Sequence, residues 1–346
     1  MTTPNEITAV IPSFRGAARI GPTLRALAAD APGLATVLVD DGSDDDTSQA
    51  GERNGAGLRL EVVRHPVNRG RAAARNTGVR AARTDWVLLL DDDMELGAGA
   101  VAAHRAAQSS PEGAQRAFLG RIVLPENLPP GPFTDFLLRE AEDRHRKLTA
   151  LREDVPWAHC LTGQLSVRRQ VLLDCGLFDE ALSGYGFEDI ELGIRLRRAG
   201  VRLAYLPEAR SVHRAYALDL RRLRERTYES GLGALRLAAA HADDPEVRRF
   251  LRLDGMGRID LRDDSAFLVA MRLLNRLLQR PWILRGLAGR RGQRVLDGMV
   301  SALERLPARR LRDLAYHFVR DVAYYHGIAE ARARGGAAPS LPGAGG

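Results

Sequence analysis

The chain has 346 residues, of which 45% are hydrophobic and 27% charged, a composition typical of a folded globular protein. Eighteen consecutive apolar residues occur nowhere, so we expect no membrane-spanning helix, and the first sixteen residues show no secretory signal. The two cysteines, Cys160 and Cys175, match neither a disulfide framework nor a metal motif, and we therefore expect a reducing, cytoplasmic location.

The first half of the chain alternates strand and helix patterns. Buried-strand patterns cover residues 7–12, 36–43, 58–65, 85–93, 115–125 and 201–207, the last ended by Pro207. Helical patterns cover residues 19–30, 69–83, 132–152 and 186–200. Strands that alternate with helices of this length imply right-handed crossovers, so we predict an α/β fold with a mostly parallel central sheet.

The C-terminal third differs in both pattern and charge. From residue 218 onwards only helical periodicity is present, and residues 335–346 are too rich in Gly, Ala and Pro to build a core. Residues 1–214 carry 27 basic and 29 acidic side chains (−2), whereas residues 215–346 carry 24 and 15 (+9). We predict an α/β domain over 1–215, a basic helical region over 216–334 and a disordered tail over 335–346.

Two acidic clusters follow predicted strands. "VLVDDGS" places Asp40 and Asp41 after one strand, and "VLLLDDDMEL" places Asp91, Asp92 and Asp93 after another. In open α/β sheets, ligands bind beyond the carboxyl ends of the strands, so the two clusters should converge. Aspartates also occur in ordinary solvated turns, but convergent carboxylates favour a hard divalent cation, Mn²⁺ or Mg²⁺.

Five segments in order resemble glycosyltransferase family 2, whose members transfer sugars from nucleotide-diphosphate donors and have the GT-A fold. They are "TAVIPSFRG", "VLVDDGSDDDT", "HPVNRGRAAARNTGV", "LLLDDDMEL" and the acceptor segment "LTGQLSVRRQVLLDCGLFDEALSGYGFEDIELGIRLRRAG". The resemblance covers roughly residues 6–215 and implies a GT-A domain followed by a helical extension. Arg15, Gln164 and Cys175 depart from the residues common in the family.

The resemblance implies a nucleotide site at the first two segments. It assigns Pro12 and Ser13 to the opening strand of this site and Asp41 to the base or ribose, with Asp40 in a supporting role. Gly42 then permits the tight turn that follows.

The same resemblance implies a metal site at the D-x-D element. Asp93 matches the direct metal ligand, and Asp91 matches a contact to the ribose or to the metal shell. Asp92 could share either role. His213 matches the position from which related enzymes supply a histidine to the metal, although a single histidine is more often structural.

Two further pairs of residues could act on the donor and the acceptor. Arg75 could pair with phosphate, or simply lie on a solvated helix face, and Gly70 would allow backbone amides to face phosphate. The resemblance points to Asp189, beside Glu188, as the general base that accepts a proton from the acceptor hydroxyl. We expect the helix N-terminus to keep Asp189 ionised.

The implied activity is transfer of a sugar, with inversion, from a nucleotide-diphosphate donor, with UDP-sugars favoured. The hydroxyl acceptor could be a lipid-linked molecule, a polysaccharide or a small molecule. The alternatives are a nucleotidyltransferase that makes nucleotide-sugars and an inactive nucleotide-sugar-binding protein. The basic C-terminal helices could pack on the sheet, form a homodimer interface or rest on an anionic membrane at the inner face of the cell. Nucleic acid is not expected, because no binding motif accompanies the arginines.

Overall fold

The computed structural model describes residues 6–182, 186–214, 219–253, 269, 272–273, 276–278 and 280–335. Internal contacts divide the chain into two compact units. The first unit comprises residues 1–127, 138–183 and 188–216, and the second comprises residues 128–137, 184–187 and 217–346. The predicted domain limits at 215 and 334 stay predictions, and the predicted tail lies outside the described residues from 336 onwards.

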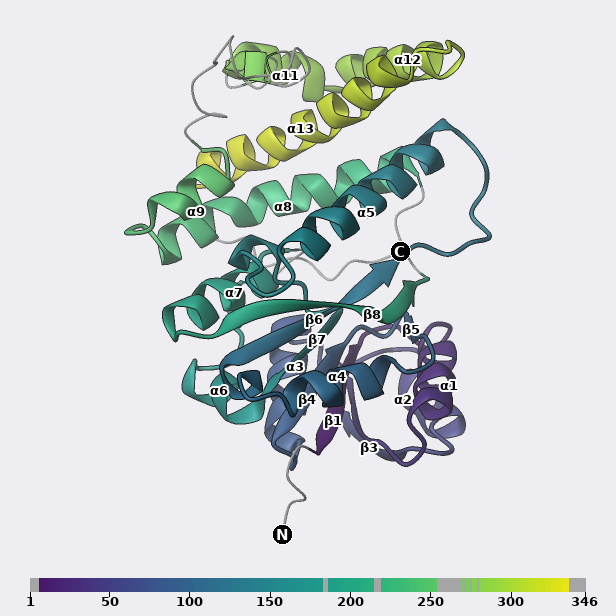
Figure 1. Cartoon of the computed structure of the whole chain (residues 1–346). Helices are drawn as coiled ribbons and strands as arrows, with labels where there is room; N and C mark the ends of the chain where they lie inside the picture. Colours follow the sequence, from purple (N-terminus) through teal and green to yellow (C-terminus); the bar gives the residue numbers. More distant parts are fainter. Residues whose placement is uncertain are drawn as a thin grey trace. The chain divides into compact units, whose positions relative to one another are not determined.

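The first unit is built on a sheet with the strand order β3-β2-β1-β4-β7-β6-β8-β5 among its described residues (Figure 1). The strands are β1 (Ile7–Ser13), β2 (Ala35–Asp40), β3 (Arg59–Arg64), β4 (Trp86–Leu90), β5 (Met94–Leu96), β6 (Arg116–Val123), β7 (Gln164–Arg168) and β8 (Arg202–His213). The α/β prediction is confirmed. Strands β3, β2, β1 and β4 are parallel, but β7 is antiparallel to β4 and β6, and β5 is antiparallel to β8. The sheet is therefore more mixed than predicted, because β5 and β7 were not recognised as strands.

Helices cover both faces of this sheet. The alternation of strand side chains sends Trp86, Leu88 and Leu90 to one hydrophobic core, and Val87 and Leu89 to the other. The first core is closed by α1 (Ile20–Asp30), α2 (Thr47–Asn54) and α4 (Ala100–Gln108). The second is closed by α3 (Arg71–Ala81), α6 (Arg169–Asp174) and α7 (Glu188–Arg198). Single turns of 3₁₀ helix lie at Gly113–Gln115 and Trp157–His159. Apolar side chains on both faces explain why the central strands are almost continuously hydrophobic.

Strand β8 does not end at Pro207, contrary to the prediction. Its parallel pairing with β6 passes from Gly120↔Leu206 directly to Arg121↔Arg210, so that three residues of β8 bulge out of the ladder. Proline is tolerated at such a bulge, because its missing N–H is not needed for a ladder hydrogen bond. The strand then continues to His213, which lies opposite Met94 of β5.

The second unit is helical in its described residues, as predicted from residue 218 onwards. Its helices are α8 (Leu220–Ala240), α9 (Pro245–Phe250), α11 (Pro281–Ala288), α12 (Arg290–Glu304) and α13 (Arg309–Ala333), and the first turns of α5 (Pro132–Ala150) belong to it. Helices α8 and α13 cross at Gly231 and Gly327, where a Cβ on Gly231 would lie 2.1 Å from the carbonyl oxygen of Tyr324. Only glycine permits this close approach. None of the described helices has the length and apolarity needed to cross a bilayer.

Candidate active site at the carboxyl edge of the sheet

Arg75 is the centre of the buried charges in the first unit. It projects from α3 with 2% of its surface exposed, and it joins two carboxylates from distant parts of the sequence. Its Nη2 lies 2.7 Å from Oδ1 of Asp91, and its Nη1 lies 3.1 Å from Oε1 of Glu188. Desolvation opposes ionisation of both groups, yet the facing charges lower the pKa of Asp91 and raise the pKa of Arg75. Arg75 is therefore a paired, buried cation, not the side chain of a solvated helix face.

Asp189 lies beside this pair, at the start of α7. Its Oδ2 accepts a 3.4 Å hydrogen bond from the backbone N–H of Thr162. Desolvation and the adjacent charge of Glu188 raise the pKa of Asp189 to about 7, although Arg75 opposes the shift. The expectation that the helix N-terminus keeps Asp189 ionised is therefore wrong. Desolvation and the like charge of Glu188 raise the pKa of Asp189 more than the helix N-terminus lowers it. A carboxylate with a pKa near neutrality is well suited to accept and release a proton.

Asp93 and His213 lie together at the paired ends of β5 and β8. Nε2 of His213 is 3.2 Å from Oδ2 of Asp93, and the backbone N–H of Arg214 donates to the carbonyl oxygen of Asp93. The other carboxylate oxygen of Asp93, Oδ1, is buried and has no hydrogen-bond partner among the described residues. A buried carboxylate oxygen without a partner is rare in proteins, and a bound cation would satisfy it.

Asp91 does not join these two residues, because it is held by Arg75. Consistent with this, the part of the chain that the structure describes contains no group of three His, Cys, Asp or Glu side chains arranged to hold a metal. Magnesium and manganese are commonly held by one or two protein ligands, with substrate phosphates completing the coordination. Asp93 and His213 fit that smaller set of ligands.

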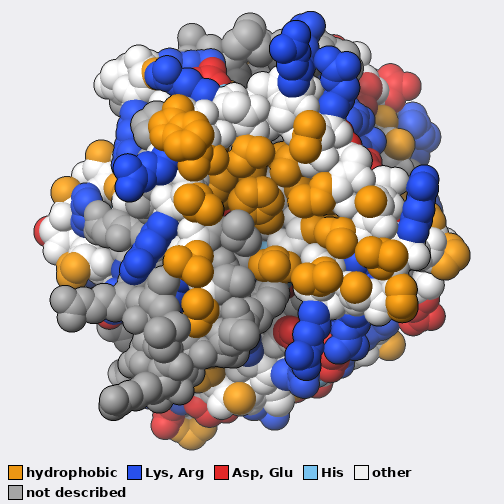
Figure 2. Space-filling view, turned by 90° about the horizontal axis from the view of Figure 1, so that it is seen from above, with side chains coloured by type: hydrophobic (Ala, Val, Ile, Leu, Met, Phe, Trp, Pro, Cys, Tyr) orange, Lys and Arg blue, Asp and Glu red, His pale blue; other side chains and the backbone are white. Residues whose placement is uncertain are grey.

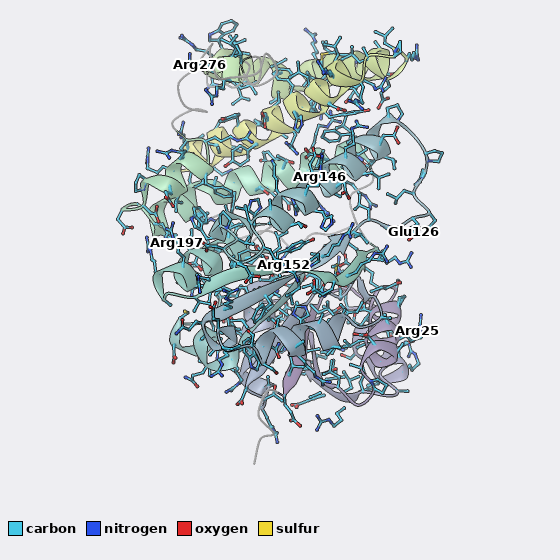
Figure 3. All side chains as sticks on the ribbon, viewed as in Figure 1. Arg25, Glu126, Arg146, Arg152, Arg197 and Arg276 are labelled. Atoms are coloured by element: carbon cyan, nitrogen blue, oxygen red, sulfur yellow. The ribbon has the colours of Figure 1, made fainter. Side chains whose placement is uncertain are left out.

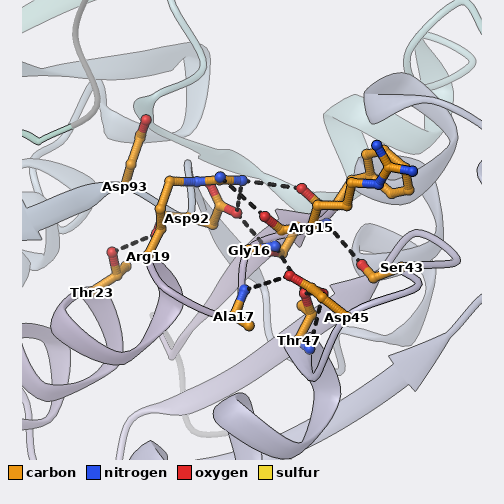
Figure 4. Close-up of polar contacts among 12 residues, drawn as sticks. Arg15, Gly16, Ala17, Arg19, Thr23, Ser43, Asp45, Thr47, Asp92 and Asp93 are labelled. Atoms are coloured by element: carbon orange, nitrogen blue, oxygen red, sulfur yellow. Dashed lines mark hydrogen bonds and ion pairs between the residues drawn. The ribbon is translucent and has the colours of Figure 1, made fainter. Parts of the chain in front are cut away.

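Asp92 points towards the start of α1, away from Asp93 (Figure 4). Its Oδ2 accepts hydrogen bonds from Oγ of Ser13 at 2.5 Å and from Nη2 of Arg19 at 3.0 Å. Arg19 also donates to the carbonyl oxygens of Phe14 and Arg15. Arg19 was not identified from the sequence, since it looked like an ordinary first residue of a helix. It links the end of β1 to the turn that carries the three aspartates.

Asp41 is surrounded by donors from the loop before α3. Its carboxylate accepts from Nδ1 of His65 at 2.7 Å and from the backbone N–H groups of Arg69 and Gly70 at 2.9 and 2.8 Å. Asp41 is 3% exposed. Gly70 was predicted to let backbone amides face phosphate, and its own N–H donates to this carboxylate. The structure thus gives Asp41 a loop-ordering contact, and its predicted contact with the nucleotide stays a prediction.

The remaining predicted residues take positions around these groups. Gly42 has a φ of +72°, and a Cβ there would lie 2.3 Å from the backbone of Val67, so the tight turn requires glycine. Pro12 pairs with Val39 near the end of β1. Asp40 accepts from the backbone N–H of Ser43.

Buried polar atoms without partners gather at this edge of the sheet. In addition to Oδ1 of Asp93, three buried atoms of the described residues have no hydrogen-bond partner: Nε of Arg75, Oγ1 of Thr162 and Oε2 of Glu188. Thr162 was not singled out from the sequence. Protein interiors satisfy nearly all such atoms, so these groups are the ones that a bound ligand would satisfy.

The fold and the acidic edge together define a GT-A-type α/β domain. Among solved structures, a mannosyltransferase from Pyrobaculum calidifontis, in complex with GDP-Man and Mn²⁺, aligns with a TM-score of 0.56. It is 19% identical and covers 94% of this chain and 89% of the other. TarS 1–349 of S. aureus aligns with a TM-score of 0.50 at 17% identity, covering 95% and 92%. At these identities the likeness concerns the fold alone.

The family is defined by sequence. The profile described as Glycosyltransferase like family 2 matches residues 4–235, and the chain belongs to this family. A pre-mycofactocin glycosyltransferase of Mycobacterium tuberculosis is 32% identical over 239 residues, which are 69% of this chain and 48% of the relative. A validoxylamine A glucosyltransferase of Streptomyces hygroscopicus is 27% identical over 326 residues, or 87% and 73%. The chain spans about half the length of the first of these relatives.

Proposed function

We propose that this chain transfers a sugar from a nucleotide-diphosphate donor to a hydroxyl acceptor, with inversion at the anomeric carbon. The observation that carries the proposal is the position of Asp189, whose pKa is raised to about 7, beside the ion pairs that the buried Arg75 makes with Asp91 and Glu188. The family membership and the names of the relatives support the same reaction class.

The proposed step uses Asp189 as the general base. The acceptor oxygen forms a bond to the anomeric carbon, the bond from that carbon to the diphosphate breaks, and the hydroxyl proton passes to Asp189. The nucleoside diphosphate leaves with the bonding electrons. Glu188 acts by holding Arg75 and by raising the pKa of Asp189, and it does not need to touch the substrate.

Asp93 and His213 are the residues that would hold a divalent cation. When bound, Mn²⁺ or Mg²⁺ would neutralise the charge that develops on the departing diphosphate. Asp91 remains at the ribose or in the outer shell of this site, oriented by Arg75. UDP-sugars are our favoured donors, but the mannosyltransferase of similar fold contains GDP-Man, so both nucleotides should be tested.

A thermal-shift screen of UDP- and GDP-sugars, each with Mn²⁺, Mg²⁺ or EDTA, tests the donor and the metal together. A matching donor at about 100 times its Kd should stabilise the protein by about 2.7 kcal/mol, and the shift should require the metal. Asp93→Asn should remove the metal dependence, whereas the exposed control Asp174→Asn should retain it.

Product analysis separates the proposed function from its alternatives. Transfer to a hydroxyl acceptor, with slow donor hydrolysis in its absence, supports the transferase. Pyrophosphate release from a nucleoside triphosphate and a sugar phosphate would instead identify a nucleotidyltransferase. Tight, metal-dependent donor binding with neither transfer nor hydrolysis would identify an inactive binding protein.

A further inference from the structure

Exposed apolar side chains concentrate in one part of the second unit. The described residues include nine exposed large apolar side chains, and six of these lie between residues 273 and 311. They are Leu273, Leu277, Trp282, Val295, Leu306 and Leu311. Trp282 is 74% exposed and Val295 is 67% exposed. Single exposed apolar residues are normal, but a group of them that is ringed by charge marks an interaction surface.

In helix α12 the exposed large apolar side chain, Val295, is not needed for the packing of the helix. Leu296 and Val300 are buried and supply the apolar face that packs on the protein. A second apolar stripe of Val295, Met299 and Ala302 follows the same helical spacing on another face, where Val295 and Ala302 are exposed. Seen from above the view of Figure 1, apolar side chains gather across the face of the protein, with Lys and Arg side chains around them (Figure 2).

The positive charge of the C-terminal third coincides with this surface. Residues 272–312 contain eleven arginines and only two acidic residues, a balance of +9, which is the whole excess of residues 215–346. Arg276, labelled in Figure 3, is exposed, and so are Arg290, Arg291 and Arg294. No ion pair joins Arg291 or Arg294 to any acidic residue within the described ranges. The apolar side chains therefore lie in a segment with an excess of positive charge, and at Arg291 and Arg294 no described acidic side chain pairs with that charge.

Exposed apolar side chains together with an excess of positive charge favour one class of partner over a second copy of the chain or nucleic acid. A second copy of the chain would bring a second excess of +9 to the contact, and like charges at an interface are unfavourable. Nucleic acid offers phosphates, and bases that stack on aromatic rings, but no apolar phase for the exposed Leu306 and Leu311. A bilayer that contains anionic lipids satisfies both requirements, because its headgroups attract arginine and its interface accepts tryptophan and leucine.

We propose that this docking face, formed by the six exposed apolar side chains and the arginines of residues 272–312, binds the surface of an anionic lipid bilayer. The apolar side chains enter the boundary between headgroups and acyl chains, and the arginines contact the headgroup phosphates. The sugar-transfer site lies in the first unit, so the proposal does not depend on the reaction.

Vesicle co-sedimentation of the full chain tests the proposal. Vesicles of phosphatidylcholine with about 30 mol% phosphatidylglycerol should pellet the protein in about 50 mM salt. Pure phosphatidylcholine vesicles should not, and about 0.5 M salt should weaken the binding. Arg291→Glu/Arg294→Glu should lower the partition coefficient at least about tenfold, since each basic residue near an anionic surface contributes measurably. Leu306→Ser should lower it by about threefold or more.

Matched controls come from the first unit. Arg53→Glu/Arg83→Glu reverses two exposed arginines, and Leu151→Ser removes a leucine that is 41% exposed, compared with 49% for Leu306. Both controls should bind vesicles as the unaltered protein does. Equal binding by the Arg291→Glu/Arg294→Glu variant and its control would overturn the proposal, and so would failure to pellet on anionic vesicles at low salt. A dimer in analytical ultracentrifugation that Leu306→Ser dissociates, with no vesicle binding, would assign the face to self-association instead.

Discussion

The candidate active site and the docking face use arginine in opposite ways. At the carboxyl edge of the sheet, Arg75 is buried and each of its terminal nitrogens faces a carboxylate. On the docking face, Arg291 and Arg294 are exposed and form no ion pair with the described acidic residues. A buried cation must be neutralised within the fold, so its partners are fixed in place, whereas an exposed cation is free to meet an external anion. Composition alone does not distinguish the two cases, and burial does.

The largest expected effect concerns the proton acceptor beside the buried pair. Asp189→Asn keeps the shape of the side chain but cannot accept the acceptor proton. We expect the transfer rate at saturating donor to fall by about 10²- to 10⁴-fold. Donor affinity, measured by calorimetry, should stay within about twofold in the absence of acceptor. An unchanged transfer rate would remove Asp189 from the mechanism.

The next effect compares a buried with an exposed arginine directly. Arg75→Met leaves Glu188 buried with Arg71, 3.4 Å away, as its one cationic partner in the part of the chain that the structure describes. We expect the free energy of unfolding in urea to fall by about 3 kcal/mol. Arg80→Met removes an exposed arginine from the same helix, and it should change the free energy of unfolding by about 0.5 kcal/mol or less. Similar losses in both variants would mean that the ion pairs of Arg75 contribute nothing particular to the fold.

The dependence of the rate on pH follows from the raised pKa of Asp189, which lies at about 7. Only the ionised carboxylate is a base, so the transfer rate should fall about fivefold from pH 7 to pH 6 and about tenfold from pH 6 to pH 5. A rate independent of pH between 5 and 8 would contradict the assignment.

The same shift predicts the sign of a stability effect. The folded state favours the protonated carboxyl, so ionisation opposes folding increasingly as the pH rises from about 4, the unfolded pKa, to about 7. Asp189→Asn should therefore raise Tm more at pH 8 than at pH 5. The exposed Asp174→Asn serves as the control and should show no such difference.

The smallest expected effect is the change in the free energy of unfolding when arginines of the docking face are replaced. Arg291→Glu/Arg294→Glu should change the free energy of unfolding by no more than about 0.5 kcal/mol, because neither side chain has an ion-pair partner among the described residues. Loss of vesicle binding at unchanged stability would sharpen the contrast with Arg75→Met.

Much of the fold could be predicted from the sequence, because buried strands and amphipathic helices leave periodic patterns. β1, β2, β3, β4 and β6 all lie within predicted segments, or within one residue of them. The antiparallel β7 was missed, because "QLSVR" has a buried glutamine in a strand position. That Gln164 accepts a hydrogen bond from Ser211 at 2.7 Å, a partner 47 residues away that no local pattern reveals.

The site was predictable in its residue types but not in its pairing. The acidic runs and "ARNTG" pointed to Asp91, Asp93 and Arg75. That Asp92 turns to Ser13 and Arg19 depends on the direction of successive side chains in a turn, which the sequence "DDD" does not specify. The raised pKa of Asp189 likewise depends on desolvation in three dimensions.

The bulge at Pro207 has a consequence for changes in chain length. The three bulged residues lie outside the ladder, whereas Arg210, Ser211 and Val212 pair with β6. Side chains along a paired strand alternate between faces, so removing one of these paired residues would invert the direction of the side chains that follow it, up to His213. The imidazole would then point away from Asp93 although every residue at the site was retained. In this segment, which resembles a loop in sequence, a deletion should be far less tolerated than a substitution.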